Sequence, residues 1–182
     1  MTRADIAMCE QAGLPLAGIN NAYQITDKLS IHYGCDTKWW RAHWDKLYPG
    51  PARYSLKKND KDQGVTGVTQ MECGERQGLS HKWPVICTGG NSGYQAINLL
   101  YLLGYNVIIL LGYDMQINGQ AHWHGDHTEQ GLVNPKAATV KGWRAEFKVL
   151  AGRLLGTSTR VINCSRETAL TCFPKANLED VL

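Results

Sequence analysis

The sequence predicts an α/β protein whose mostly parallel, doubly wound sheet carries helices on both faces. Short apolar runs alternate along the chain with stretches of helical periodicity, which is the pattern of repeated strand–helix–strand units. The run from Asn106 to Gly112 is rich in Val, Ile and Leu without polar alternation, as in strands buried on both faces of a parallel sheet. With 182 residues the chain is long enough for a full core, and we expect a single domain over residues 1–182.

The same two patterns place the other elements. The polar segment 48–63 holds two prolines and is expected to be a surface loop. The helix expected at 37–47 carries Trp39, Trp40 and Trp44, which we interpret as packing residues. In the long amphipathic helix expected at 137–155, one stripe holds Val140, Trp143, Phe147, Leu150 and Leu154. A helix is expected at 2–11, with Ile6, Ala7 and Met8 facing inward, and another after the glycine turn, with Ala96, Leu99, Leu100 and Leu103 at helical spacing. Strands are expected at 14–19, 29–33, 65–73, 79–87 and 160–164, and a short helix is expected in the tail.

The segment 88–93 (TGGNSG) joins the strand at 79–87 to the next helix and is the first candidate binding element. Its glycines allow positive φ, and Asn91 or Ser92 can cap the helix so that free N–H groups point outward. Such a helix N-terminus can bind anions. An ordinary strand–turn–helix connection without a ligand has the same residue pattern and is the alternative interpretation. Gly104 lies where a C-cap glycine is expected. Strand, helix and the strand at 106–112 then form a right-handed crossover unit.

Ligands of such sheets bind beyond the carboxyl ends of the strands, and several polar residues follow strands here. The turn residues Asn91, Ser92 and Gly93 lie at one carboxyl end, and Tyr113 and Asp114 lie at another. Two more candidates follow earlier strands: Asn20, a ligand for base or ribose or else a turn residue, and Asp36, a ligand for a ribose hydroxyl or else a helix cap.

Composition excludes several classes of protein. No apolar run is long enough to span a membrane, and residues 1–10 have no signal-peptide core, so we expect neither a membrane span nor a leader. Six scattered cysteines without a CxxC motif favour reduced thiols and a cytoplasmic location. A net charge of +3 does not indicate nucleic acid, and it is compatible with an anionic small ligand.

The loop at 122–127 (HWHGDH) is open to three interpretations. Its residue pattern matches the metal motif of metallo-β-lactamases. The side chains of His122, His124, Asp126 and His127 could therefore hold a divalent metal. However, no histidine follows residue 127 to complete a dinuclear site. A neutral imidazole could instead act as general base, and the third interpretation is a polar surface loop packed on Trp123.

Several segments together resemble the bacterial lipooligosaccharide sialyltransferases. They are the turn and helix from Asn91 to Tyr94, the helix end Leu103-Gly-Tyr105, the strand end at 109–114 with the histidine loop beyond it, and the tail from Val161 to Pro174. The same wording occurs in Rossmann-like proteins, among them 6-hydroxymethylpterin pyrophosphokinase-like and motility-associated glycosyltransferase-like proteins. In length and in the segment 36–40 (DTKWW), the chain is most similar to small proteins encoded by tailed bacteriophages.

The resemblance implies residue roles. The turn residues Ser92 and Gly93 would bind a sugar nucleotide, Asn20 would contact it, and His127, His124 or His122 would be the base. Members of the family read H-x-x-G-H in that loop, whereas here Asp126 separates Gly125 from His127. They also open with a strand and a Gly-Gly-Pro-Ser-type phosphate loop, while this sequence opens in the helix that follows, so we expect that strand and loop to be lacking.

The sequence therefore favours a glycosyl- or nucleotidyl-transferase that uses a nucleotide-activated donor and no firmly implied cofactor. A second hypothesis is a non-catalytic Rossmann-like phage accessory or structural protein, and a third is a metal-dependent hydrolase built on the histidine loop. The expected partners are a nucleotide ligand and either a second copy of the chain or a phage protein, but no nucleic acid.

Overall fold

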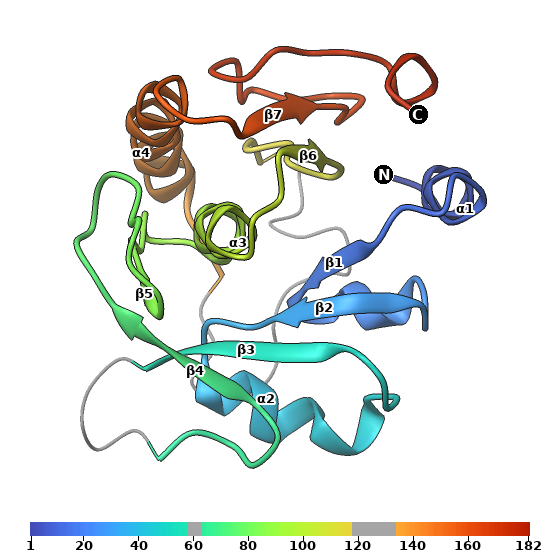
Figure 1. Ribbon diagram of the computed structural model, residues 1–182, viewed down its shortest axis with the longest axis vertical. Coiled ribbons are helices and arrows are strands. Elements are labelled where there is room, and N and C mark those ends of the chain that lie inside the picture. Colours follow the sequence, from blue (N-terminus) through green and yellow to red (C-terminus); the bar gives the residue numbers. More distant parts are fainter. Residues whose placement is uncertain (58–62, 118–133) are drawn as a thin grey trace.

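The computed structural model describes residues 1–57, 63–117 and 134–182, and it has the predicted α/β Rossmann-like fold. Five parallel strands form a curled sheet in the order β1-β2-β3-β4-β5, and two further parallel strands, β6 and β7, form a second sheet (Figure 1). The strands are β1 (Leu16–Ile19), β2 (Leu29–Tyr33), β3 (Ala52–Lys57), β4 (Thr69–Cys73), β5 (Val85–Ile86), β6 (Val107–Leu110) and β7 (Arg160–Asn163).

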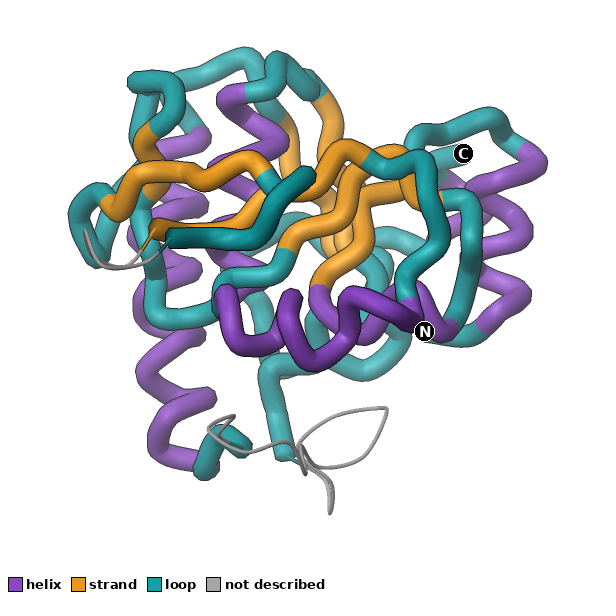
Figure 2. Tube along the Cα trace, turned by 90° about the horizontal axis from the view of Figure 1, so that it is seen from below, coloured by secondary structure: helices purple, strands orange, loops and turns teal. Residues whose placement is uncertain are grey.

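Within the described residues, four α-helices accompany these strands. They are α1 (Arg3–Gln11), α2 (Thr37–His43), α3 (Ser92–Leu102) and α4 (Ala137–Leu154), and short 3₁₀ turns lie at η1 (Asn20–Gln24), η2 (Trp44–Lys46) and η3 (Leu178–Asp180). Seen from below, the strands lie between helices (Figure 2).

Alternation along β2 places α2 and α3 on opposite faces of the five-stranded sheet. Ile31 and Tyr33 belong to a core cluster that includes Ala96 and Leu99 of α3. Between them, His32 turns to the other face and packs edge-on against Trp39 of α2, with ring centroids 5.4 Å apart. Helices on both faces are what the sequence predicts.

The helix ends follow from local residues. Thr2 caps α1 through a reciprocal pair of hydrogen bonds with Asp5, and Gly104 ends α3 at φ +87°. After Leu103, the N–H groups of Gly104 and Tyr105 donate to the carbonyls of Tyr101 and Leu100, which is the hydrogen-bond pattern of a Schellman motif.

The structure differs from the prediction in six elements. The segment 48–63, expected to be a loop, contains β3. Strands β4 and β5 are shorter than the apolar runs that predicted them, and α2, expected to reach residue 47, ends at His43. In α1 the buried residues are Asp5 and Cys9, whereas Ala7 is exposed. The prediction of a central strand at 106–112 was also wrong, because β6 pairs with β7 alone among the described residues and Val107 is 44% exposed. A cavity, described below, lies along its other edge.

Candidate functional site

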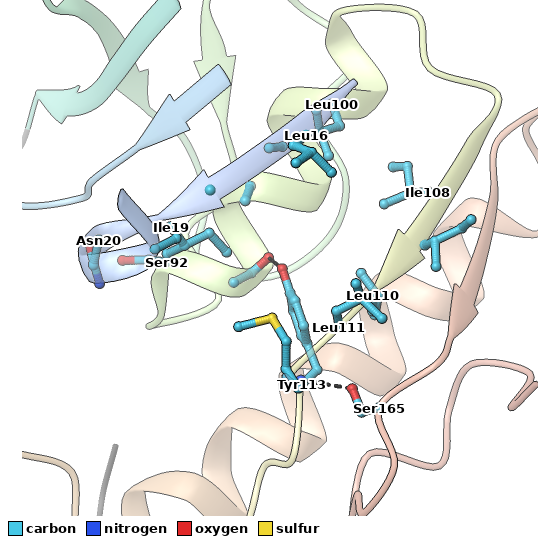
Figure 3. Close-up of a pocket in the computed structure, with 18 of the residues that line it drawn as sticks. Leu16, Ile19, Asn20, Ser92, Leu100, Ile108, Leu110, Leu111, Tyr113 and Ser165 are labelled. Atoms are coloured by element: carbon cyan, nitrogen blue, oxygen red, sulfur yellow. Dashed lines mark hydrogen bonds between the residues drawn. The ribbon is translucent and has the colours of Figure 1, made fainter. Parts of the chain in front are cut away.

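A cavity of about 1310 Å³ lies between β1, β6 and the first turn of α3. This volume exceeds the roughly 300–1,000 Å³ of ordinary small-molecule sites. Seven residues that the sequence singled out line it: Asn20, Asp36, Asn91, Ser92, Gly93, Tyr113 and Asp114. Figure 3 shows Asn20, at the end of β1, and Ser92, at the start of α3, on the same side of the cavity.

The glycine turn presents the N-terminus of α3 to this cavity. Gly89 and Gly90 have φ of +52° and +75°, which side chains other than glycine rarely adopt. Asn91 is the N-cap, and its Oδ1 accepts a hydrogen bond of 2.9 Å from the backbone N–H of Tyr94. Its Nδ2 is buried and has no hydrogen-bond partner among the described residues. The turn thus combines a helix N-terminus with an amide donor that is unsatisfied in this structure.

Gly93 allows the ring of Tyr113 to lie against the start of α3. A Cβ added at Gly93 would be only 2.9 Å from Cε1 of Tyr113. The Tyr113 hydroxyl donates to the carbonyl of Gly93 over 3.1 Å, and its backbone N–H donates to Oγ of Ser165 (Figure 3). Burial raises the pKa of Tyr113 well above its ordinary value. The phenol therefore stays protonated at neutral pH and orders the loop as a hydrogen-bond donor.

Asn20 adopts a strained backbone conformation at the end of β1. Its φ is +47°, in the left-handed region that residues other than glycine seldom occupy. Nε2 of the buried His32 donates a 2.7 Å hydrogen bond to the carbonyl of Asn20, which helps to hold this conformation. Burial lowers the pKa of His32 to about 4, so the imidazole is neutral at physiological pH. His32 thus positions Asn20 beside the cavity.

The two aspartates of the predicted site differ in environment. Asp36 occupies the N-cap position of α2, although its side chain makes no capping hydrogen bond to the described residues. Asp114 is exposed, and its Oδ1 accepts a hydrogen bond from the backbone N–H of Met115. Both line the cavity. Their roles as nucleoside ligands stay predictions.

Three residues at or beside the site were missed in the sequence. A Cβ added at Gly90 would lie 3.2 Å from Nη2 of Arg76 and 3.3 Å from Nε1 of Trp143. Arg76 forms a 2.9 Å ion pair with Glu146 of α4, which brings a guanidinium to the glycine turn. Trp143 had been assigned to the packing stripe of α4, but it lines the cavity. No local motif marks Arg76 or His32, because both act through contacts between distant segments.

The histidine loop lies outside the described residues, so nothing in the structure bears on His122, His124, Asp126 or His127. The residues that flank it do lie at the site, since Gln116 and Pro135 both line the cavity. Across residues 1–57, 63–117 and 134–182, no group of three His, Cys, Asp or Glu side chains is arranged to hold a metal ion.

The fold and the cavity define a Rossmann-like α/β protein with polar residues gathered at the carboxyl ends of parallel strands. Comparisons with protein-family models, curated proteins and solved structures find no match. Among the helices in the described part of the chain, none has the length and apolarity needed to cross a membrane. All six cysteines are free thiols.

Proposed function

We propose that the chain transfers a glycosyl or nucleotidyl group from a nucleotide-activated donor bound at the glycine turn. The observation that carries this proposal is the arrangement at Asn91. Its Nδ2 has no partner among the described residues, and together with the first N–H groups of α3 it would supply donors to a donor phosphate. Nη2 of Arg76 also lies beside Gly90, although pairing with Glu146 offsets the charge of this guanidinium.

The reaction assigns complementary tasks to the residues around the cavity. An acceptor hydroxyl oxygen forms a bond to the anomeric carbon or the phosphorus of the donor. The bond from that centre to the leaving phosphate oxygen breaks, and the phosphate departs with the electron pair. The donors at Asn91 and Ser92 would stabilise its negative charge. His127 would take the acceptor proton, with His124 or His122 as substitutes, while Asn20 and Asp114 contact the nucleoside.

Calorimetric titration with CMP, UDP, GDP and their sugar conjugates tests donor binding. We expect one nucleotide class to bind, and we expect Asn91→Asp to weaken its binding by at least about tenfold, because a carboxylate would face the phosphate. Asp caps helices as well as Asn does, so the thermal stability of this variant should not change.

Asn106→Asp is the matched control, since it makes the same change in charge at an exposed residue. Asn106 precedes the amino end of β6, whereas the candidate residues Tyr113 and Asp114 follow its carboxyl end. It should leave nucleotide binding intact. Replacing His122, His124 and His127 together with Ala should abolish transfer and preserve binding. Absence of heat with every nucleotide would contradict the proposal. Elemental analysis that found stoichiometric zinc, manganese or iron would favour the hydrolase hypothesis instead.

A further inference from the structure

A second cavity, of about 360 Å³, lies between α4 and the segment that follows β7. Its lining consists of Lys141, Arg144, Ala145 and Lys148 from α4 and of residues 169–172 from the later segment. None of these residues lines the larger cavity that holds the candidate site. The volume is at the lower end of the roughly 300–1,000 Å³ of small-molecule sites, so a compact ligand would fill it.

Three cations form the α4 side of this second cavity. Lys141, Arg144 and Lys148 follow one another at intervals of three and four residues, so they share one face of the helix. None of them forms an ion pair with an acidic side chain of the described residues. Like charges at this spacing repel and slightly destabilise a helix. The stability of α4 therefore does not account for the arrangement.

The opposite wall adds no negative charge. It exposes Thr171 and presents the half-buried thiol of Cys172. Burial raises the pKa of Cys172 to about 11, so this thiol is neutral at physiological pH. No acidic side chain of the described residues lines the cavity. The charge of the three cations is therefore uncompensated inside a concave site, which attracts anions.

Packing and hydrogen bonding hold the two walls together. After β7 the chain turns back toward α4 (Figure 1). There Leu170 is buried in the same core cluster as Phe147 and Leu150 of α4. The backbone N–H of Ala169 donates to the carbonyl of Asp114 over 2.7 Å. Because the walls are fixed before a ligand binds, little conformational entropy is lost on binding.

The order of the cations indicates the class of ligand. Arg144 lies between the two lysines, and its planar guanidinium can hold one phosphate through two hydrogen bonds, whereas a lysine acts as a point charge. At a rise of about 1.5 Å per residue, Lys141 and Lys148 are about 10 Å apart along α4, which is enough for two neighbouring anionic groups. A phosphate carries a charge of about −1.5 to −2 at neutral pH, so two phosphates match three cations better than two carboxylates do.

We propose that the cavity between α4 and residues 169–172 binds a small soluble ligand that carries two phosphate groups. Arg144 holds one phosphate through both arms of its guanidinium, and Lys141 and Lys148 neutralise the remaining charge. The concave shape favours a compact ligand over the extended surface of a membrane or a nucleic acid. The proposal uses no residue of the glycine turn and is independent of the proposed function.

An NMR titration with pyrophosphate tests this site, because each backbone amide reports separately. We expect saturable shifts at Lys141, Arg144, Lys148 and Thr171, and Arg144→Gln should weaken this binding at least about tenfold. Arg153→Gln is the matched control, since it removes the same charge from an exposed position of α4 outside the cavity. At physiological ionic strength its more distant charge is largely screened, so the affinity should change less than about twofold.

Each alternative gives a different result. The fluorescence of the fully buried Trp40 reports that both variants are folded. Shifts confined to residues 89–94 would place the anion at the glycine turn, which would overturn this proposal and leave the proposed function standing. Equal weakening by Arg144→Gln and Arg153→Gln would show diffuse attraction in place of a site.

The last comparison concerns larger anions. A short DNA duplex and vesicles of phosphatidylserine and phosphatidylcholine are titrated in the same way. If pyrophosphate causes no shift at the cavity residues, the proposal is overturned. Shifts caused there by the duplex or the vesicles alone would assign the basic face of α4 to a nucleic acid or a membrane surface.

Discussion

At the scale of single residues, the site depends on a buried histidine. His32 is 1% exposed, and its two aromatic neighbours on α2 exclude water from the imidazole. Only the neutral ring is stable there, and the hydrogen bond from Nε2 to the carbonyl of Asn20 fixes the tautomer. The strained turn at Asn20 is therefore linked to the protonation state of a core residue.

This linkage predicts a dependence of stability on pH. The unfolded chain takes up a proton at His32 near pH 6.5, whereas the folded chain does so only near its lowered pKa of about 4. Between these values the unfolded state binds more protons, so stability falls as the pH falls from 6.5 to 4, by on the order of 3 kcal/mol. Urea unfolding at pH 7 and pH 4.5 measures the loss. His32→Gln keeps an N–H donor and does not titrate, so its loss should be smaller, and an equal loss would contradict the assignment.

At the scale of elements, the two glycines that bracket α3 have different physical tasks. Gly104 supplies only a left-handed backbone, because no atom of the described residues lies within 4 Å of a Cβ added there. Gly89 supplies the same freedom and also space, since a Cβ added there would overlap the ring of Tyr94. That ring is fully buried and its hydroxyl donates to the carbonyl of Gly78, so it cannot move aside.

Alanine at these two positions should therefore give unequal losses of stability. We expect Gly104→Ala to cost about 1 kcal/mol, which is the strain of a left-handed alanine. Gly89→Ala combines that strain with overpacking against Tyr94 and should cost roughly 3 kcal/mol or more. Denaturant unfolding of both variants compares the two values. Equal losses would mean that the Tyr94 ring relaxes, contrary to its anchored position.

Elements with a local signal were predicted, and those held by distant contacts were not. The apolar runs and stripes of β2, β7, α3 and α4 were sufficient to place them. β3 was missed because it lies in the polar segment 48–63 with its two prolines, which indicated a loop. Within β3, the guanidinium of Arg53 lies 5.1 Å from the centre of the Trp44 ring and donates to the carbonyl of Tyr48. β5 is short because Asn98 of α3 hydrogen-bonds the backbone of Ser80 and Cys87 in place of a strand partner.

At the scale of the whole molecule, the candidate residues that the sequence singled out meet at one cavity because they follow strand ends. Asn20, Asn91 and Tyr113 each follow a recognisable strand, and parallel topology gathers such ends at one edge. The break between the two sheets was not predicted from the run at 106–112. A strand buried on both faces and a strand at an open edge under two helices have the same apolar composition.

The two sheets are connected through α1 by an ion pair that lies beyond the carboxyl end of β7. Oδ1 of Asp5 lies 2.6 Å from Nη2 of Arg166, which follows β7, whereas α1 itself leads into β1. Burial alone would raise the pKa of Asp5, but hydrogen bonds from Arg166 and Thr2 together hold it below its ordinary value. The carboxylate form is thus favoured in the folded state, and its contribution is lost only as the pH falls through that lowered pKa.

Removing this pair should release α1 without unfolding the rest of the chain. We expect Asp5→Asn and Arg166→Gln each to speed amide exchange in α1 by about tenfold at neutral pH, while β2 and β3 keep their protection. Lys28→Gln is the control, because it removes an exposed ion pair, with Glu10, from the same helix and should leave its exchange unchanged. If all three variants behaved alike, α1 would be held by its apolar contacts around Cys9. The ion pair would then not couple the two sheets.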